Sequence, residues 1–363
     1  MDTTHEHGRG SALGPARSSL LDLLRGTAAL LVALHHLRSL TLVARADLSS
    51  PPSVLLDAFL VLAGFGPAPV IVFFVLSGYL VGGSLLRMPP LPASPADFLL
   101  RRVLRLWLVL VPACALTLLL AGQGVEECAA GALAGNLAFL QGILVHPFGG
   151  NFPLWSLGAE FWCYVLFLAG WMGCLWRGAV RWLSLLALAG LLLALPAHIK
   201  GYFPLWFAGA AIHFLPARGQ FPRAALAVLF INLLGVRLFG SLTGEWGGNL
   251  VIAASTAWAI HSCTEEGPLA RMLRATAGAW ARLAAFSFSL YVLHIPLYTW
   301  MLPSVLGIHQ QAQPTPRSLT ALCVAYASVV ALSAVFAWFT ERHTNRIRAW
   351  LFRRLGLAAR FRH

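Results

Sequence analysis

Charged residues are scarce in this sequence. Asp, Glu, Lys and Arg make up 11% of its 363 residues, whereas hydrophobic residues make up 58%. A soluble domain usually carries about 25% charged residues, so the composition excludes an ordinary soluble enzyme. The alternating apolar segments of a transmembrane β-barrel are also absent. Many apolar runs instead reach the roughly 20 residues that a helix needs to cross a bilayer. We therefore predict an all-α, polytopic integral membrane protein.

Several signatures of well-known chemistries are missing as well. The six cysteines are scattered without CxxC spacing, so neither a disulfide framework nor a metal site is indicated. There is no Walker loop, no GxSxG elbow and no HExxH motif. No Asp follows His35 or His36 within five residues, so the His–x4–Asp signature of soluble acyltransferases is absent. The net charge of +13 comes from Lys and Arg in short loops and in the C-terminal tail, which indicates membrane orientation and not nucleic-acid binding.

Apolar segments divide the chain into candidate membrane crossings. They cover residues 20–43, 67–86, 98–121, 129–145, 154–176, 182–195, 202–215, 224–239, 250–262, 283–302 and 319–339. If segment 129–145 crossed the membrane, every later basic cluster would lie outside, against the positive-inside rule. This segment is rich in Gly and Ala, and a re-entrant role avoids the conflict. We therefore predict ten crossings, one re-entrant segment and both termini in the cytoplasm.

A single membrane domain follows from this division. We expect a cytoplasmic tail at residues 1–19, which lack the apolar region of a signal peptide. Residues 20–341 form the transmembrane domain, and the basic residues 342–363 form a second cytoplasmic tail that lies on the anionic leaflet. The protein is expected in a bacterial inner membrane as a multi-pass protein in contact with lipid. The sequence leaves open whether it forms a homo-oligomer.

Ionisable residues inside membrane spans are costly and are therefore functional candidates. Arg25 and His36 are eleven residues apart in the first span, which puts them on one face of a helix with His36 about 16 Å deeper. Asp22 lies one turn before Arg25 and can pair with it. His35 lies about 80° off that face, so a helix-packing hydrogen bond is the simpler interpretation for His35.

Further polar residues stand near the ends of other spans. Arg102 and Arg105 share one face and, with Arg25 on the same side of the membrane, could hold a polyanionic head group; topogenic charge is the alternative. Glu160 is expected near the outer surface. Ser77 and Gly78 are candidates because they allow a helix or a ligand chain to approach closely. Asn151, Trp155 and Ser156 are candidates just before Glu160 in the sequence. The last two are Tyr291 and His294, which lie near Pro296. Glu341 and Arg342 are expected to form a surface ion pair.

Six short motifs carry a resemblance to a known family. In chain order they are Arg25 and His36 with ten residues between them, FFVLSGYL at 73–80, RVLR at 102–105, PLWSL at 153–157 followed by Glu160, SFSLYVLH at 287–294 and FTER at 339–342. Together they resemble the membrane-bound acyltransferase family 3, which contains bacterial O-antigen, exopolysaccharide and peptidoglycan O-acetyltransferases. Two departures stand out. Ile71 and Val72 occupy places where many members carry an acidic residue, and His343 replaces a proline.

The resemblance implies a function and a role for several of these residues. Acyl-CoA, most simply acetyl-CoA, would be the donor, and Arg25, Arg102 and Arg105 would hold its phosphates from the cytoplasm. The acceptor would be a hydroxyl of an extracytoplasmic carbohydrate or lipid-linked glycan, entering near Glu160. His36 would act as general base on that hydroxyl or would carry the acyl group as a covalent relay.

Two other functions remain open at this point. Intramembrane charges also line the substrate paths of transporters and flippases, although no inverted repeat is seen. A second class of membrane acyltransferases pairs a buried histidine with Asn or Asp, and His294 with Asn136 could fill those roles.

Overall fold

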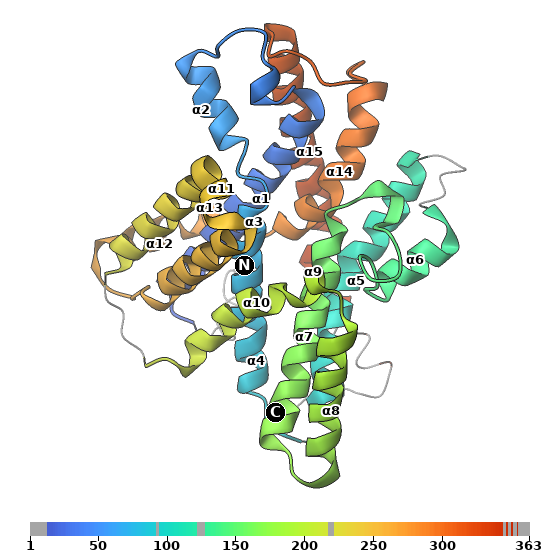
Figure 1. The fold of residues 1–363 in the computed structure, drawn as a ribbon, viewed down its shortest axis with the longest axis vertical. Helices are drawn as coiled ribbons and strands as arrows, with labels where there is room; N and C mark the ends of the chain where they lie inside the picture. Colours follow the sequence, from blue (N-terminus) through green and yellow to red (C-terminus); the bar gives the residue numbers. More distant parts are fainter. Residues whose placement is uncertain are drawn as a thin grey trace, which may run out of the picture.

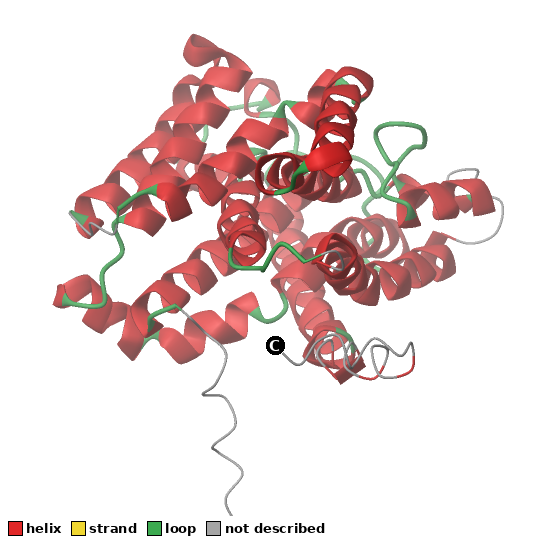
Figure 2. Ribbon diagram, turned by 90° about the horizontal axis from the view of Figure 1, so that it is seen from below, coloured by secondary structure: helices red, strands yellow, loops and turns green. Residues whose placement is uncertain are grey.

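The computed structural model describes residues 13–91, 94–121, 128–216 and 221–343, with positions 346, 347, 350 and 354. The described chain is helical throughout, with two isolated β-bridges and no strand (Figure 2). The prediction of an all-α protein is therefore confirmed for these residues. The predicted cytoplasmic tails, residues 1–19 and 342–363, lie largely outside them.

The longer helices follow the apolar runs of the sequence. They are α1 (Pro15–Thr41), α3 (Ala68–Ser77), α5 (Ser94–Ala121), α7 (Leu154–Leu175), α8 (Gly178–Ala194), α10 (Tyr202–Ala211), α11 (Pro222–His261), α14 (Ser287–Ser304) and α15 (Pro316–Phe339). Shorter elements connect them: η1 (Arg45–Asp47), α2 (Val54–Leu62), π-helical η2 (Gly78–Gly82), α4 (Gly83–Leu86), α6 (Ala130–Leu137), η4 (Phe148–Gly150), α9 (Ala197–Lys200), η5 (Ile212–Phe214), α12 (Gly267–Ala275), α13 (Ala277–Ala284) and η6 (Glu341–His343).

Local sequence explains several of the helix ends. Pro15 and Pro316 begin α1 and α15, where a missing backbone N–H costs nothing. Thr315 and Ser318 form a reciprocal capping box at the start of α15. These signals place helix starts, whereas the apolar faces decide how the helices pack.

The number of crossings is lower in the structure than in the sequence-based prediction. Six helices of the described chain are long and apolar enough to span a membrane, or up to eight if each of two bent pairs counts as one span. The prediction of ten crossings is therefore not confirmed. One bent pair joins residues 178–194 to 197–214 at 117°, and α11 is a single helical run interrupted at Phe239 and Gly244. The orientation of the termini stays a prediction.

The segment predicted to be re-entrant forms a short helix and an irregular loop. The eight residues of α6 extend about 12 Å, too little to cross a core of about 30 Å. Asn136 is fully buried and holds the loop, since its amide nitrogen donates to the carbonyls of Ala132 and His146 (2.9 Å each) and its oxygen accepts from Phe148 N (3.1 Å). Gln141, also buried, donates to Leu154 O at the start of α7. Whether this segment enters the bilayer stays a prediction.

Helix α1 runs through the middle of the bundle (Figure 1). It packs against α3, α13, α14 and α15, while α7 and α8 form a helical hairpin beside them. The largest core cluster joins residues of α1, α3, α5, α7, α10 and α14. The polar residues of α1 therefore face other helices and not lipid alone.

Helices α3 and α10 approach each other closely at Gly78. A Cβ atom at this position would overlap the backbone carbonyl of Trp206. The expected close approach at Gly78 is thus made by a helix, and the chain turns π-helical from Gly78 onward.

We predict that Gly78→Ala destabilises the protein by about 1–3 kcal/mol, because backbone atoms cannot move aside as a flexible side chain would. The melting temperature in detergent measures the effect. Gly190→Ala on α8 is the control, since no atom lies within 4 Å of its added Cβ, and it should be neutral or slightly stabilising. Equal melting temperatures for the two variants would contradict the packing argument.

Candidate active site

A cavity of about 120 Å³ lies among α1, α3, α5, α7 and α14. Its apolar walls come mainly from α3 and η2. Its polar lining residues are Arg25, Ser77, Arg105, Ser156, Glu160, Tyr164, Ser287 and Tyr291. Six of the sequence-predicted site residues therefore line one cavity.

Two arginines and a carboxylate mark one end of this cavity. Arg25 is half-buried, whereas Arg105 is exposed, so this end reaches the protein surface. The charges of Arg105, Asp22 and Glu160 all act on Arg25. Two guanidinium groups on one pocket wall are suited to an anionic ligand.

The predicted pair of Arg102 and Arg105 is divided in the structure. Arg102 donates to Ser84 Oγ (2.6 Å) and lies over the Phe98 ring (5.6 Å from its centroid). It is not among the cavity-lining residues, although its charge acts on Tyr164. Arg105 and Arg25 thus line the cavity together, whereas Arg102 lies one helical turn before Arg105 on α5 and outside the cavity lining.

Glu160 ends a chain of hydrogen bonds. The Trp206 indole donates to Ser77 Oγ (3.1 Å), Ser77 Oγ lies 3.2 Å from the Tyr164 hydroxyl, and Tyr164 donates to the Glu160 carboxylate. An indole only donates and an ionised carboxylate only accepts. The Ser77 hydroxyl must therefore donate to Tyr164, so every donor points toward Glu160. Ser77, where a ligand chain is expected to approach closely, thus supports this carboxylate through Tyr164.

Glu160 lies in the same cavity as Arg25 and Arg105. Asn151 and Leu154, at the start of α7, are buried, and Gln141 in the loop after α6 donates to Leu154 O. Helix α7 therefore begins inside the protein. The expected place of Glu160 near the outer surface of the membrane stays a prediction.

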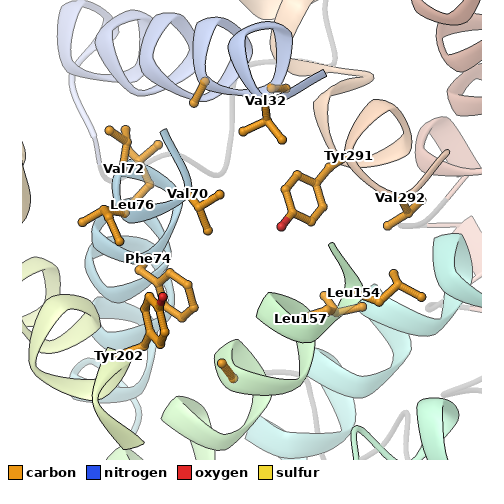
Figure 3. Packing of buried hydrophobic residues seen from close by; sticks show 14 of the residues in the cluster. Val32, Val70, Val72, Phe74, Leu76, Leu154, Leu157, Tyr202, Tyr291 and Val292 are labelled. Carbon is orange, nitrogen blue, oxygen red and sulfur yellow. The ribbon is translucent and has the colours of Figure 1, made fainter. Parts of the chain in front are cut away.

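Tyr291 closes the other side of the cavity. Its hydroxyl donates to Pro153 O (3.1 Å) and lies 2.6 Å from Ser156 Oγ. Figure 3 shows its ring pointing from α14 into the space between α3 and α7. Nearby, buried Asn151 donates to Val292 O (2.7 Å), whereas Trp155 packs on Tyr202 (4.8 Å between centroids). The predicted role of Trp155 in the site stays a prediction.

A histidine cluster lies beyond Tyr291. The rings of His36 and His294 are stacked, with centroids 5.2 Å apart and planes at 15°. His35 and Phe152 contact the His36 ring at 5.1 and 4.8 Å. The centroid of Tyr291 is 6.0 Å from that of His294, so Tyr291 stands between the cavity and the histidines. Sequence analysis selected both His36 and His294 but did not foresee their contact.

The hydrogen bonding of His294 sets its tautomer. Its Nδ1 lies 3.1 Å from Leu290 O, and because a carbonyl only accepts, Nδ1 carries the proton in the neutral ring. Nε2 then holds a lone pair, and this buried atom has no partner in the described part of the chain. Asn136 bonds only within its own loop in the contacts described above, which disfavours the alternative of a His294–Asn136 pair.

Glu341 is held by α14. Its carboxylate accepts from the backbone N (2.8 Å) and the hydroxyl (2.6 Å) of Ser289. The expected surface ion pair involves the Arg342 side chain, which lies outside the described residues, so it stays a prediction. Its charge also acts on Arg25. The FTER motif was the one signal that could have placed Glu341 in the site.

Within the described ranges, no group of three or more His, Cys, Asp or Glu side chains could hold a metal ion.

Comparison with known proteins adds two findings. The acyltransferase 3 family model, described as an acyltransferase domain, matches residues 19–356. An O-acetyl transferase of Shigella phage Sf6 is 29% identical over 165 residues, which are 41% of this chain and 45% of the phage protein. The match thus spans less than half of that relative. No solved structure matches the chain.

We predict that Ser77→Ala destabilises the protein by about 1–3 kcal/mol, because Trp206 loses its acceptor and Tyr164 its donor. Ser333→Ala on α15 is a matched control. The buried Ser333 hydroxyl has no hydrogen-bond partner among the described residues, so its removal should be neutral or stabilising. Melting temperatures of both variants in the same detergent give the comparison. A Ser77→Ala variant as stable as the Ser333→Ala variant would argue against the hydrogen-bond chain.

Proposed function

The chain belongs to the membrane-bound acyltransferase family 3, and from this premise we propose that it transfers an acetyl group from acetyl-CoA to a carbohydrate hydroxyl. We place it in a bacterial inner membrane, with the donor bound from the cytoplasm and the acceptor from outside. The observation that carries this proposal is the arrangement of the site. A cavity with Arg25 and Arg105 at one end borders, through Tyr291, on the stacked His36 and His294.

The arginine end of the cavity suits the donor. The phosphates of acetyl-CoA would bind Arg25 and Arg105, with Arg102 close behind them, because guanidinium groups bind phosphate in a bidentate manner. The apolar walls from α3 and η2 would hold the pantetheine arm beside Ser77. Glu160, fixed by Tyr164, would orient Arg25 by its charge and keep that end of the cavity from collapsing when no phosphate is bound.

His36 would perform the chemistry by one of two routes. As a general base, it takes the proton of the acceptor hydroxyl, the oxygen attacks the thioester carbonyl, the C–S bond breaks, and the CoA thiolate receives the proton back. As a relay, its ring nitrogen attacks the thioester carbonyl, the C–S bond breaks, and the CoA thiolate leaves with the proton of the other ring nitrogen. The acceptor hydroxyl then takes the acetyl group and gives its proton to the imidazole. In either route the thioester must pass Tyr291, which now separates the cavity from His36.

The acceptor side is proposed from what surrounds His36. Phe152 contacts the His36 ring and is 46% exposed, so a sugar could approach along this side chain. The similarity to the phage protein, which is described as an O-acetyl transferase, supports a hydroxyl as the acceptor. The acceptor would be a carbohydrate or a lipid-linked glycan such as an exopolysaccharide or O-antigen unit.

We predict that His36→Ala lowers acetyl transfer by about 10²- to 10⁴-fold, as expected for loss of a base or nucleophile. The assay uses purified protein in lipid with labelled acetyl-CoA and a panel of glycan acceptors. His35→Ala should cost less than about tenfold, because His35 only contacts the catalytic ring, and exposed His309→Ala should have no effect.

Incubation with acetyl-CoA in the absence of an acceptor distinguishes the two routes, since only the relay releases a burst of one CoA per protein before an acceptor is added. If wild type consumes no thioester with any acceptor, a transporter or flippase becomes the better reading. If His36→Ala is as active as wild type, another residue performs the chemistry.

We also predict that Arg105→Gln raises the KM for acetyl-CoA by about tenfold with little change in kcat, because it removes a phosphate contact far from the reacting atoms. Arg101→Gln on the same helix is the control, since Arg101 pairs with Asp97 (2.8 Å). Initial rates over a range of acetyl-CoA concentrations show the difference. An equal rise in KM for both variants would indicate a general loss of positive charge.

A further inference from the structure

Two arginines stand at the end of α1 opposite Arg25. Arg38 on α1 donates to Val43 O (3.2 Å), and Arg237 on α11 has a weak contact to Leu60 O (3.5 Å). The Nε atoms of both side chains are buried and have no hydrogen-bond partner in the described chain. The two charges act on each other, and none of the described carboxylates forms an ion pair with either.

The loop between α2 and α3 holds Arg237 in place. A Cβ atom on Gly64 would overlap the guanidinium of Arg237, so only glycine lets this side chain lie against the loop. The same loop contacts His35 through a backbone hydrogen bond at Ala63, and the charges of both arginines act on His35. Two like charges are thus held together by the fold without a counter-ion.

Such a pair is expensive inside a membrane protein. An unpaired arginine in a membrane span costs several kcal/mol, and two close together also repel each other. Guanidinium groups with unused donors bind phosphate well. We propose that Arg38 and Arg237 bind the phosphate group that links the acceptor sugar to its lipid carrier. This proposal rests on the proposed function and names the acceptor class.

The position of the pair fits this role. Arg38 follows His36 by two residues and Arg25 by 13, so it lies about 20 Å along α1 from the donor end of the cavity. Arg38 is one turn after His35, and the charges of Arg38 and Arg237 act on His35. The rings of His35 and His36 are 5.1 Å apart, so a sugar attached to a phosphate at Arg38 would reach His36 past His35. The acetyl group and its acceptor would then reach His36 from opposite ends of one helix.

The surroundings favour a phosphate that carries a lipid. Leu238 and Phe239 follow Arg237 on α11 and are 49% and 58% exposed, and Leu62 at the end of α2 is 48% exposed. An apolar chain attached to the phosphate could lie on these side chains. A free, water-soluble phosphate would gain nothing from them.

The test compares two acceptors in nanodiscs of phosphatidylcholine. One is a disaccharide on a short polyprenyl diphosphate, and the other is the same disaccharide as an uncharged polyprenyl glycoside. Arg38→Gln and Arg237→Gln should each raise the KM for the diphosphate acceptor by about tenfold, with kcat and the KM for acetyl-CoA little changed. The KM for the glycoside should not change. Arg45→Gln is the matched control, because Arg45 is exposed and already paired with Asp57 (2.6 Å).

A binding measurement keeps the test independent of turnover. Binding of a fluorescent polyprenyl diphosphate to wild type should weaken about tenfold in both variants, and lysine at either position should restore part of it. Added phosphatidylglycerol should compete poorly. If it displaces the probe as well as unlabelled diphosphate does, the pair binds lipid head groups and the acceptor assignment is wrong.

Equal KM shifts for the charged and uncharged acceptors, or unchanged probe binding in both variants, would overturn the proposal. Absence of thioester consumption by wild type, with normal probe binding, would instead overturn the proposed function and leave the phosphate site standing.

Discussion

Charge inside a low-dielectric bundle must be neutralised, solvated or used, and this constraint shapes the centre of the structure. Arg25 on the central helix has Glu160, Asp22 and Glu341 within electrostatic reach, and each of these comes from a different part of the chain or a different turn. Glu160 and Glu341 are in turn held by hydroxyl donors. The helices that supply these groups are therefore tied to α1 by more than apolar packing.

The cavity and the histidines form two compartments that share Tyr291. The tyrosine is anchored at Pro153 and Ser156, so its position depends on the start of α7 and on the buried loop before it. This arrangement gives the loop after α6 a part in the site, although none of its residues carries out chemistry. A substitution that shifts this loop would first change the position of Tyr291 and only then the surroundings of His36.

Sequence reasoning succeeded where the signal was local. Helix α1 with Arg25 and His36, and helices α5, α7 and α15, follow directly from long apolar runs, and the polar residues within them were recognised as candidates. It failed where the outcome depends on how helices pack. The stacking of His36 on His294 joins residues more than 250 positions apart, so no local pattern could reveal it. The ten predicted crossings are not confirmed, because six helices of the described chain, or up to eight with the two bent pairs, are long and apolar enough to span a membrane.

The hydrogen-bond chain at Glu160 has a consequence for proton movement. Each hydroxyl in the chain receives a donor on one side and gives its own proton to the next, and the far end is the indole of Trp206. An indole N–H does not ionise in the physiological range, so it can neither take up a proton nor release one. The chain is therefore a dead end for proton conduction across the bundle, so it fixes the Glu160 carboxylate in place without opening a proton path from the cavity to α10.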